Sequence, residues 1–335
     1  MKQRSKASEG RITIQSVADR AGVSIATVSR VLSGNVKVRE DLAERVIAAA
    51  KELDYIPSAV AQRLARGRTS SVGVLVPDLA DPYFPEVVKG IHNGAAASGY
   101  RLVIADSDNR PQDEAPLIRD LARQVDGLIL VSPRADNVDL KALEQLPIPV
   151  VLLNRMEPGI GLASVGVDNF AAMSELCGHI ASLGHKRVSF LSGPTESWQQ
   201  RERARAVLHA ANFGLNVKEV PAGGSIHSGH ESLDIALEHQ PTAVICWNDL
   251  VALGVIARAT ELGIRIPEDL SVTGFNDIEF AQFSSPPLTT VRSPQVGLGE
   301  AGWAVMERML AGETPDHPPL LEASLVLRAS TRAPK

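Results

Sequence analysis

Several residue types are scarce in this chain of 335 residues. Its two cysteines, Cys177 and Cys246, stand alone, without the spacing of a disulfide framework or a metal motif. We expect both to be small buried residues in a reducing compartment. No apolar run reaches the ~18 residues that predict a membrane span. The first ten residues are polar and basic, unlike a secretory signal. These absences predict a globular cytoplasmic protein with no membrane partner.

Motifs of common enzyme classes are missing too. The glycine-containing segment 159–166 has the wrong spacing for a dinucleotide loop, and it precedes an expected strand instead of a helix. No Walker A run and no nucleophile elbow is found. His227 and His230 lack the further ligands of a zinc site. We therefore expect no catalytic residue, no metal and no cofactor, and an enzyme is the weaker alternative.

Charge is distributed unevenly along the chain, whose formal net charge is −5. Residues 1–69 hold 13 basic against 7 acidic residues, a net charge of +6. The rest holds 21 against 32, a net charge of −11. A basic head on an acidic body concentrates the attraction for phosphate at one end, which favours a nucleic-acid partner there.

Residues 13–32 predict two short helices joined by a tight turn. Gly22 permits the bend, Val23 fills the corner, and Ser24 can cap the second helix. Such a pair can place its second helix in the major groove of DNA, although a small helical subdomain without a DNA role is the alternative. Apolar residues recur at helical spacing in both helices: Val17, Ala18 and Ala21, then Val28, Val31 and Leu32.

A third amphipathic helix is expected from about residue 38 to residue 53, and a fourth follows Pro57. Ser58 can cap the fourth helix and Gly67 ends it. It is shorter than the ~12–15 residues at which an isolated helix is marginal in water. We therefore expect it to need a partner, either a second copy, DNA or both; an ordinary linker helix is the alternative.

Together these segments resemble the lactose-repressor (LacI/GalR) family of bacterial transcription regulators. The resemblance rests on Val-Ser-x-Ala-Thr-Val-Ser-Arg-Val-Leu at 23–32, Tyr-Ile-Pro at 55–57 and Ala-x-x-Leu-Ala at 61–65. It implies that the exposed face of the second helix reads bases and that Leu64 wedges into the minor groove at the operator centre. The expected DNA-binding residues are Thr13, Ser24, Ile25, Ala26, Thr27, Ser29, Arg30, Ser58, Ala61, Leu64 and Ala65.

From residue 71 onward, short apolar runs alternate with helical segments, which predicts parallel sheets. The fold class is therefore an all-α helix-turn-helix head plus an α/β body of two doubly wound parallel-sheet subdomains. The resemblance implies the fold of periplasmic binding proteins, with crossings between the subdomains near 165–168, 290–292 and 323. The expected strands are 72–76, 102–105, 127–131 and 149–153, then 187–191, 243–246 and 270–275, and finally 323–327 after a helix near 294–310.

The expected domain order follows from these segments. A disordered arm is expected first, then the helix-turn-helix domain, the hinge helix with its linker, and an effector-binding and dimerisation domain made of an N-subdomain and a C-subdomain. Their expected ranges are 1–10, 11–57, 58–70 and 71–335, with the N-subdomain at about 71–165 and 292–322 and the C-subdomain at about 166–291 and 323–332.

Ligands of open α/β sheets bind at the carboxyl ends of the strands, and several motifs fall there. Asp81-Pro82-Tyr83-Phe84 resembles a family Asn-Pro-Phe/Tyr-Phe motif, with Asp81 in place of asparagine. Tyr83 or Phe84 is placed to lie against a sugar ring, and a packed core pair is equally open. The family's effector-clamping arginine falls on Arg203, whose guanidinium suits vicinal hydroxyls or a carboxylate. Arg201 and Arg205 are expected on the surface.

The other matches lie at three further strand ends. Asn248 is expected to bond the effector, with Asp249 as the alternative helix cap. Asn154 and Asn276 replace the family's usual aspartates, and because an amide both donates and accepts, we expect an effector with acceptors or negative charge. The expected effector-binding residues are Asp81, Tyr83, Phe84, Asn154, Trp198, Arg203, Asn248, Phe275 and Asn276.

The chain is therefore interpreted as a homodimeric transcription repressor. Its partners are a pseudo-palindromic operator in double-stranded DNA, a second copy of itself, and a small metabolite in the cleft: a sugar, polyol, sugar acid or nucleoside. Because no heptad tail follows the last expected strand, a coiled-coil tetramer is not expected. A transport binding protein is the second alternative, against which the missing signal peptide and the basic head argue.

Overall fold

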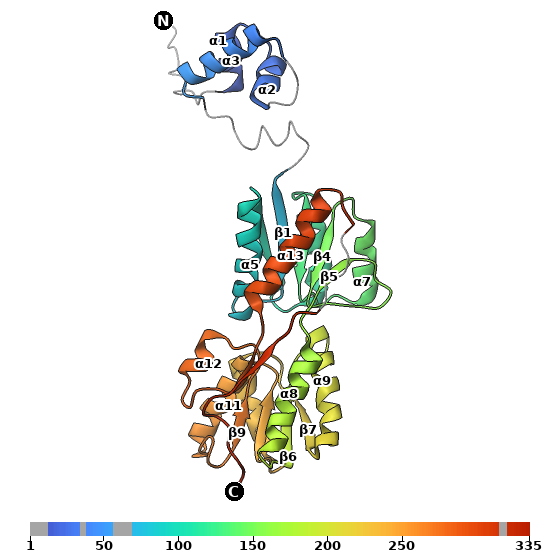
Figure 1. Ribbon diagram of the computed structural model, residues 1–335, viewed down its shortest axis with the longest axis vertical. Coiled ribbons are helices and arrows are strands. Elements are labelled where there is room, and N and C mark those ends of the chain that lie inside the picture. Colours follow the sequence, from blue (N-terminus) through green and yellow to red (C-terminus); the bar gives the residue numbers. More distant parts are fainter. Residues whose placement is uncertain (1–12, 34–37, 56–68, 315–319) are drawn as a thin grey trace, which may run out of the picture. The chain divides into compact units, whose positions relative to one another are not determined.

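A computed structural model describes residues 13–33, 38–55, 69–314 and 320–335 (Figure 1). Its contacts divide the chain between Ser70 and Ser71 into two units, called here the head and the body. The finer boundaries at residues 10 and 57 stay predictions. The expected arm, the expected hinge helix and four of the expected DNA-binding residues lie outside the described residues: Ser58, Ala61, Leu64 and Ala65.

The head consists of three helices around a core of small side chains. The helices are α1 (Ile14–Ala21), α2 (Ile25–Ser33) and α3 (Glu40–Glu52). Its buried residues include every one expected from the helical spacing of α1. They are Val17, Ala18, Ala21, Val28, Val46, Ala49 and Ala50, with Val31 and Leu32 partly buried beside them.

The turn between α1 and α2 is determined by local chemistry. Gly22 has a φ of +63° and ends α1, a conformation that favours glycine. A Cβ there would also lie 2.8 Å from Nη2 of Arg45, which donates to the carbonyl of Ala21 at 2.5 Å. The hydroxyl of Ser24 accepts from Thr27 N at 3.2 Å, which confirms the expected cap of α2.

The N-subdomain is built on a parallel five-stranded sheet in the order β2-β1-β3-β4-β5. Four of its strands were predicted; β5 was not, because its three residues form no apolar run. The strands are β1 (Ser71–Val76), β2 (Arg101–Asp106), β3 (Gly127–Val131), β4 (Val150–Leu153) and β5 (Ala163–Val165). The helices are α5 (Tyr83–Ala97), α6 (Pro111–Ala122) and α7 (Asn137–Ala142), with the late helix α13 (Gln295–Leu310).

The C-subdomain has a parallel four-stranded sheet in the order β7-β6-β8-β9. The edge strand β7 was not predicted, because most of its residues are polar and exposed. The strands are β6 (Arg187–Ser192), β7 (Asn216–Pro221), β8 (Ala243–Cys246) and β9 (Ser271–Thr273). The helices are α8 (Asn169–Ser182), α9 (Trp198–His209), α10 (Ile226–Leu237), α11 (Asp249–Glu261) and α12 (Glu279–Phe283).

Each subdomain contains one pair of helices in backbone contact. In the N-subdomain, α13 lies beside α5 although more than 190 residues separate them (Figure 1). A Cβ at Gly90 would come 2.1 Å from the carbonyl oxygen of Val296, so glycine is needed there. In the C-subdomain, a Cβ at Gly254 would come 2.0 Å from the carbonyl oxygen of Ile226. These contacts tie distant segments of chain into each subdomain.

Three segments cross between the subdomains. The first leads from β5 to α8, the second from β10 (Thr290–Arg292) to α13, and the third into β11 (Ser324–Val326). β10 and β11 pair antiparallel, and Val167 bridges to Leu321. The crossings lie at the three places that the resemblance implied. Among the described residues, no helix combines the length and the apolar character needed to cross a bilayer.

Candidate DNA-binding surface and effector cleft

Helix α2 presents a face of small and polar side chains to solvent. Ile25 is 43% exposed, and Ala26 and Arg30 are exposed as well. Thr27 and Ser29 are half-buried at the edge of this face, while Val28 on the opposite side is fully buried. Thr13 caps α1, since its hydroxyl accepts from Ser16 N. The face is therefore free of the packing that holds the head together.

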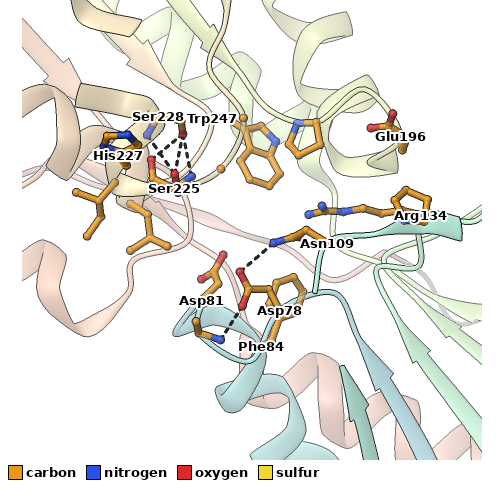
Figure 2. A pocket seen from close by; sticks show the side chains of 17 residues that line it. Asp78, Asp81, Phe84, Asn109, Arg134, Glu196, Ser225, His227, Ser228 and Trp247 are labelled. Atoms are coloured by element: carbon orange, nitrogen blue, oxygen red, sulfur yellow. Dashed lines mark hydrogen bonds between the residues drawn. The ribbon is translucent and has the colours of Figure 1, made fainter. Parts of the chain in front are cut away.

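A cavity of about 730 Å³ lies between the two subdomains of the body (Figure 2). Segments that follow β1, β2, β3, β6, β7 and β8 form its walls. Figure 2 shows carboxylate, amide, guanidinium and aromatic groups facing this space. Its main lining side chains are Asp78, Asp81, Phe84, Asn109 and Arg134 from the N-subdomain, and Glu196, Ser225, His227, Trp247 and Leu250 from the C-subdomain.

Arg203 lies behind this wall, 4% exposed. Its guanidinium carbon is 3.6 Å from the ring centre of Phe275. It donates to Asn169 Oδ1 at 3.0 Å, to the Trp247 carbonyl at 2.5 Å and to Asn276 Oδ1 at 3.4 Å. Burial lowers the pKa of Arg203 to about 9. Because these three partners are neutral, no carboxylate is hydrogen-bonded to this buried guanidinium among the described residues.

Comparisons with known proteins identify the family. The model "Bacterial regulatory proteins, lacI family" matches residues 13–58, and "Periplasmic binding protein-like domain" matches residues 177–331. The HTH-type transcriptional repressor CytR of Escherichia coli (strain K12) is 33% identical over 340 residues, covering 98% of this chain and 99% of the relative. The chain belongs to the LacI family.

Further relatives agree with this assignment. Catabolite control protein A of Priestia megaterium is 32% identical, covering 91% of this chain and 94% of the relative. The lac repressor dimer bound to operator and the anti-inducer ONPF has 30% identity and a TM-score of 0.84, covering 97% of this chain and 100% of that one. A complex of the regulator CelR with cellobiose has 27% identity and a TM-score of 0.70, covering 96% and 100%.

This LacI-family protein is a transcription repressor with a lacI-type DNA-binding head and a body like periplasmic binding proteins. Of its nine expected effector residues, Asp81 and Phe84 line the cavity. Tyr83, Asn154, Arg203, Phe275 and Asn276 are buried behind its walls. Trp198, the first residue of α9, is buried and is not part of the lining.

Asn154 and Tyr83 form a polar link inside the N-subdomain. Asn154 Nδ2 donates to the Tyr83 hydroxyl at 2.7 Å, and Asn154 Oδ1 accepts from Val167 N at 3.1 Å. The amide that replaces the family's aspartate thus ties β4 to the first crossing. Tyr83 meets Phe84 edge to face at 5.3 Å, so the two rings reach from this link to the cavity.

Asn248 and Asp249 each hold the structure of the C-subdomain together, and the expected bond of Asn248 to the effector stays a prediction. Asn248 caps α11, since its Oδ1 accepts from Val251 N at 2.9 Å while its Nδ2 donates to the Gly224 carbonyl. The alternative that Asp249 is the cap is therefore wrong. Asp249 is fully buried and accepts from the Thr290 hydroxyl at 2.5 Å and from Ile278 N at 2.8 Å. Burial raises the pKa of Asp249 to about 7.

Several cavity residues lie outside the expected effector-binding set, among them Trp247 and Arg134. Trp247 is one of the few aromatic residues that the sequence places at the expected cleft edges. The indole Nε1 of Trp247 is buried and has no hydrogen-bond partner in the described part of the chain. A Cβ at Gly193 would lie 2.3 Å from the indole and one at Gly224 2.9 Å, so two glycines make room for it. The rule that sites lie at strand ends points to Trp247, which directly follows β8.

Arg134 is held in the cavity wall through its backbone. Glu114, 1% exposed on α6, accepts from Arg134 N at 2.9 Å and from Ala135 N at 2.8 Å. Burial raises the pKa of Glu114 and lowers that of Arg134. The Arg134 guanidinium extends into the cavity beside Asn109 (Figure 2). No local motif marks Glu114, because the segment it supports lies 20 residues further along the chain.

Asp81 is a carboxyl group with a raised pKa that lines the cavity. Its Oδ1 accepts from Tyr83 N at 2.9 Å. Burial raises the pKa of Asp81 to about 6, with nearby Asp78 adding to the shift. The wall from the N-subdomain thus offers hydrogen-bond acceptors at Asp78 and Asp81 and donors at Asn109 and Arg134, a combination suited to a hydroxylated ligand.

Proposed function

We propose that the effector of this repressor binds in the cavity between the subdomains and contacts Asp81, Phe84 and the Arg203 cluster behind them. The observation that supports this most is the buried guanidinium of Arg203, whose hydrogen bonds within the described residues all go to neutral acceptors and which lies directly behind the Trp247 wall. A buried charge without an ionic partner is costly unless further hydrogen bonds satisfy it. A polar effector supplies such bonds. The class is a sugar, polyol, sugar acid or nucleoside.

We propose that α2 enters the major groove and that Ile25, Ala26 and Arg30 face the bases. What supports this is the exposure of these residues on the helix that follows the Gly22 turn. The neighbouring Thr13, Ser24, Thr27 and Ser29 would contact the backbone. Ser58, Ala61, Leu64 and Ala65, with Leu64 as the minor-groove wedge, complete the proposed interface from the sequence alone.

The subunit contact is proposed on the face formed by β2 and α5. β2 is an edge strand whose Val103 and Ile104 are 36% and 44% exposed, and a groove beside it is lined by Val88, His92 and Tyr100. Exposed apolar residues on an edge strand favour contact with another protein surface. A second copy of the same face would cover them, as an isologous dimer requires.

The chain is proposed to act as a regulator in the cytoplasm and not as an enzyme. This rests on the curated relatives, which are named as transcriptional repressors and a catabolite control protein. Incubating each ligand that binds with the protein and analysing the products tests this directly, since a regulator should return the ligand unchanged.

Calorimetry on the full-length protein tests the effector site. The probes are cellobiose, ribitol, gluconate and uridine, one from each proposed class. We expect one class to bind with a Kd below about 1 mM and to change operator affinity in a gel shift by about 5- to 150-fold. If no class binds or alters the operator complex, the proposed site is wrong.

A gel shift on the upstream region of the gene tests the DNA surface. Arg30→Ala should weaken specific binding by about 5- to 150-fold, the cost of a lost base contact. Arg20→Ala is the matched control, because Arg20 is an exposed arginine of the head that pairs with Glu52 on α3. Equal affinities of the two variants would remove Arg30 from the reading face.

A further inference from the structure

The first turn of α9 reaches across from the C-subdomain to the N-subdomain. Gln199 Nε2 donates to the hydroxyl of Ser132 at 2.6 Å, and both residues are buried. Ser197 orients that amide, since its hydroxyl donates to Gln199 Oε1 at 2.9 Å. Ser132 follows β3 with a φ of +49°, an uncommon conformation for a residue with a side chain. The backbone there is thus held in a position that meets Gln199.

Arg155 makes a second connection at the same place. Its side chain follows β4 in the N-subdomain and is 3% exposed. It donates to the carbonyl of Glu196 in the C-subdomain at 2.8 Å, and to the Ala135 carbonyl and Asn137 Oδ1 in its own subdomain at 3.2 and 3.1 Å. One buried guanidinium therefore holds the turn before α9 and the loop after β3 together.

Glu157 joins the charges of both subdomains. Its Oε1 lies 2.9 Å from Arg155 Nε within the N-subdomain, a contact ion pair without a well-aligned hydrogen bond. The same oxygen pairs with Nη2 of Arg201 on α9. The Glu157 side chain is 9% exposed and that of Arg201 is 44% exposed. Arg201 was expected only on the surface; its exposed side chain nevertheless pairs across the subdomain boundary.

These contacts adjoin the cavity and the Arg203 cluster. Glu196 and Arg134 both line the cavity, and Ala135, next to Arg134, accepts from Arg155. Arg203 follows Arg201 by two residues on the same helix. A ligand that moves α9 at Arg203, or the cavity wall at Arg134, therefore acts on the crossing contacts directly.

We propose that Ser132, Arg155, Glu157, Gln199 and Arg201 form a latch between the subdomains that sets their relative position and couples it to occupancy of the cavity. The latch itself is independent of the effector assignment; its coupling role rests on the proposed function. The members act as positioning residues, since they hold α9 and the Arg134 loop and do not themselves line the cavity.

The charge arrangement allows the latch to open reversibly. When the subdomains separate, Arg155 keeps Glu157 as its partner, because both belong to the N-subdomain. No buried charge is then left unpaired, which would otherwise be strongly destabilising. What opening loses is the Gln199–Ser132 bond, the Arg155–Glu196 bond and one partly exposed ion pair. Each contact changes the equilibrium between the latched and open forms a few-fold. Because these factors multiply, together they are within reach of the 5- to 150-fold coupling that is typical of effectors.

Distance measurements between the subdomains test the latch without an effector. Spin labels on Lys141→Cys in α7 and Glu238→Cys after α10 report the separation in the full-length dimer by pulsed electron resonance, with excess unlabelled chain to isolate distances within one subunit. Both positions are exposed, whereas Cys177 and Cys246 are buried. Arg201→Gln should lower the ratio of latched to open molecules about two- to fivefold, and Gln199→Ala/Arg201→Gln by about tenfold or more.

Arg205→Gln is the matched control. Arg205 lies on the same helix and pairs with Glu202 three residues away, so the substitution breaks an ion pair that does not cross the boundary. It should leave the distances unchanged. If Gln199→Ala/Arg201→Gln also has the wild-type distribution, the latch does not exist.

A second measurement tests the coupling. The operator affinity of the same double variant is followed in a gel shift with and without cellobiose, ribitol, gluconate and uridine. The ratio of operator affinities with and without the active probe should change at least about threefold, while that of Arg205→Gln stays as in the wild type. A wild-type ratio in the double variant overturns the coupling role. If no probe acts on the wild type, the proposed effector classes fail while the distance result on the latch stands.

Discussion

The head and the body of this repressor build their functional surfaces in different ways. The core of the head consists of valines and alanines, and its exposed face belongs to one nine-residue helix. The cores of the body contain large side chains such as Phe190, Phe275 and Trp303, and its cavity draws on segments from Asp78 to Leu250. The exposed face of the head therefore comes from one short stretch of sequence, and it is supported by a small core. The cavity of the body is formed by segments far apart in the sequence, and it is supported by larger cores.

This contrast predicts that a destabilising substitution in the head unfolds the head and leaves the body folded. A small core has little stability to lose, whereas the body, with its own cores, should keep its fold and its ligand. Charge follows the same division, with +6 before residue 70 and −11 after it. The following changes test the independence of the two regions and the roles assigned within the body.

The largest effect is expected for Val17→Asp. Val17 is fully buried in the head, and an unpaired charge there costs more than the head can lose, so operator binding should fall by more than about 1000-fold in a gel shift. Thermal unfolding followed by tryptophan fluorescence should stay unchanged, because all three tryptophans lie in the body. Ile47→Asp, at a position 58% exposed on α3, is the control and should bind nearly normally.

Arg203→Ala should abolish the response to the active effector. Its removal takes away the donors that join Asn169, Trp247 and Asn276, and with them the whole 5- to 150-fold change in operator affinity. Operator binding without effector should remain, since the head is unaffected. Arg205→Ala serves as the control on the same helix. A normal response in Arg203→Ala would show that the effector binds elsewhere.

Asp249→Asn should remove most of a pH dependence from the body. The pKa of Asp249 is raised to about 7 from 3.8, so the folded state keeps its proton while the unfolded state has lost it. Stability is therefore fully present below about pH 4 and is lost as pH rises towards 7. Between pH 5 and 8 the wild type should lose on the order of 2–3 kcal/mol relative to the variant in urea unfolding.

Asp81 should leave part of the pH dependence of stability in the Asp249→Asn variant. Its pKa is raised to about 6, so a smaller fall of stability between pH 5 and 6 should persist in Asp249→Asn. If the free energy of unfolding changes with pH in the same way in the wild type and in Asp249→Asn, then the pKa of Asp249 is the same in the folded and unfolded states and the prediction is wrong.

The smallest effect is expected for Trp247→Phe, which removes a donor and keeps an aromatic ring. If the effector accepts a hydrogen bond from the buried Nε1, affinity by calorimetry should fall about 2- to 12-fold. Trp303→Phe is the control, since its Nε1 is also buried without a partner, yet Trp303 packs on Gly94 away from the cavity lining. Equal effects of both substitutions would assign the loss to packing.

Much of the fold could be predicted from short stretches of sequence. The turn at Gly22 with the cap at Ser24, and the four apolar runs of the first sheet, agree with the structure. The strands β5 and β7 were missed because one is very short and the other is polar at the sheet edge. In both cases neighbouring strands, and not local periodicity, make the segment a strand.

The location of the effector site could be predicted from the sequence, but the hydrogen-bond partners of its residues could not. The strand-end rule and a family motif pointed to Asp81 and Phe84, and the family resemblance pointed to Arg203. Nothing within reach of Asn248 and Asp249 in the sequence indicated which would cap α11 and which would bond to Thr290, 41 residues away. The pairing of Arg201 with Glu157 was hidden in the same way, because an Arg/Glu-rich helix is more often a solvated face.

The order of amino acids alone determined the features that depend on a few neighbouring residues, namely the helical spacing, the helix caps and the glycine with positive φ. It also determined the division of charge, which is a sum over residues. The family motifs belong with them. The depth of Arg203, the lone indole N–H of Trp247 and the contacts of α9 with the other subdomain depend on segments separated by tens to hundreds of residues. Burial and hydrogen-bond geometry arise only when those segments pack, and for that reason the folded body alone decided them.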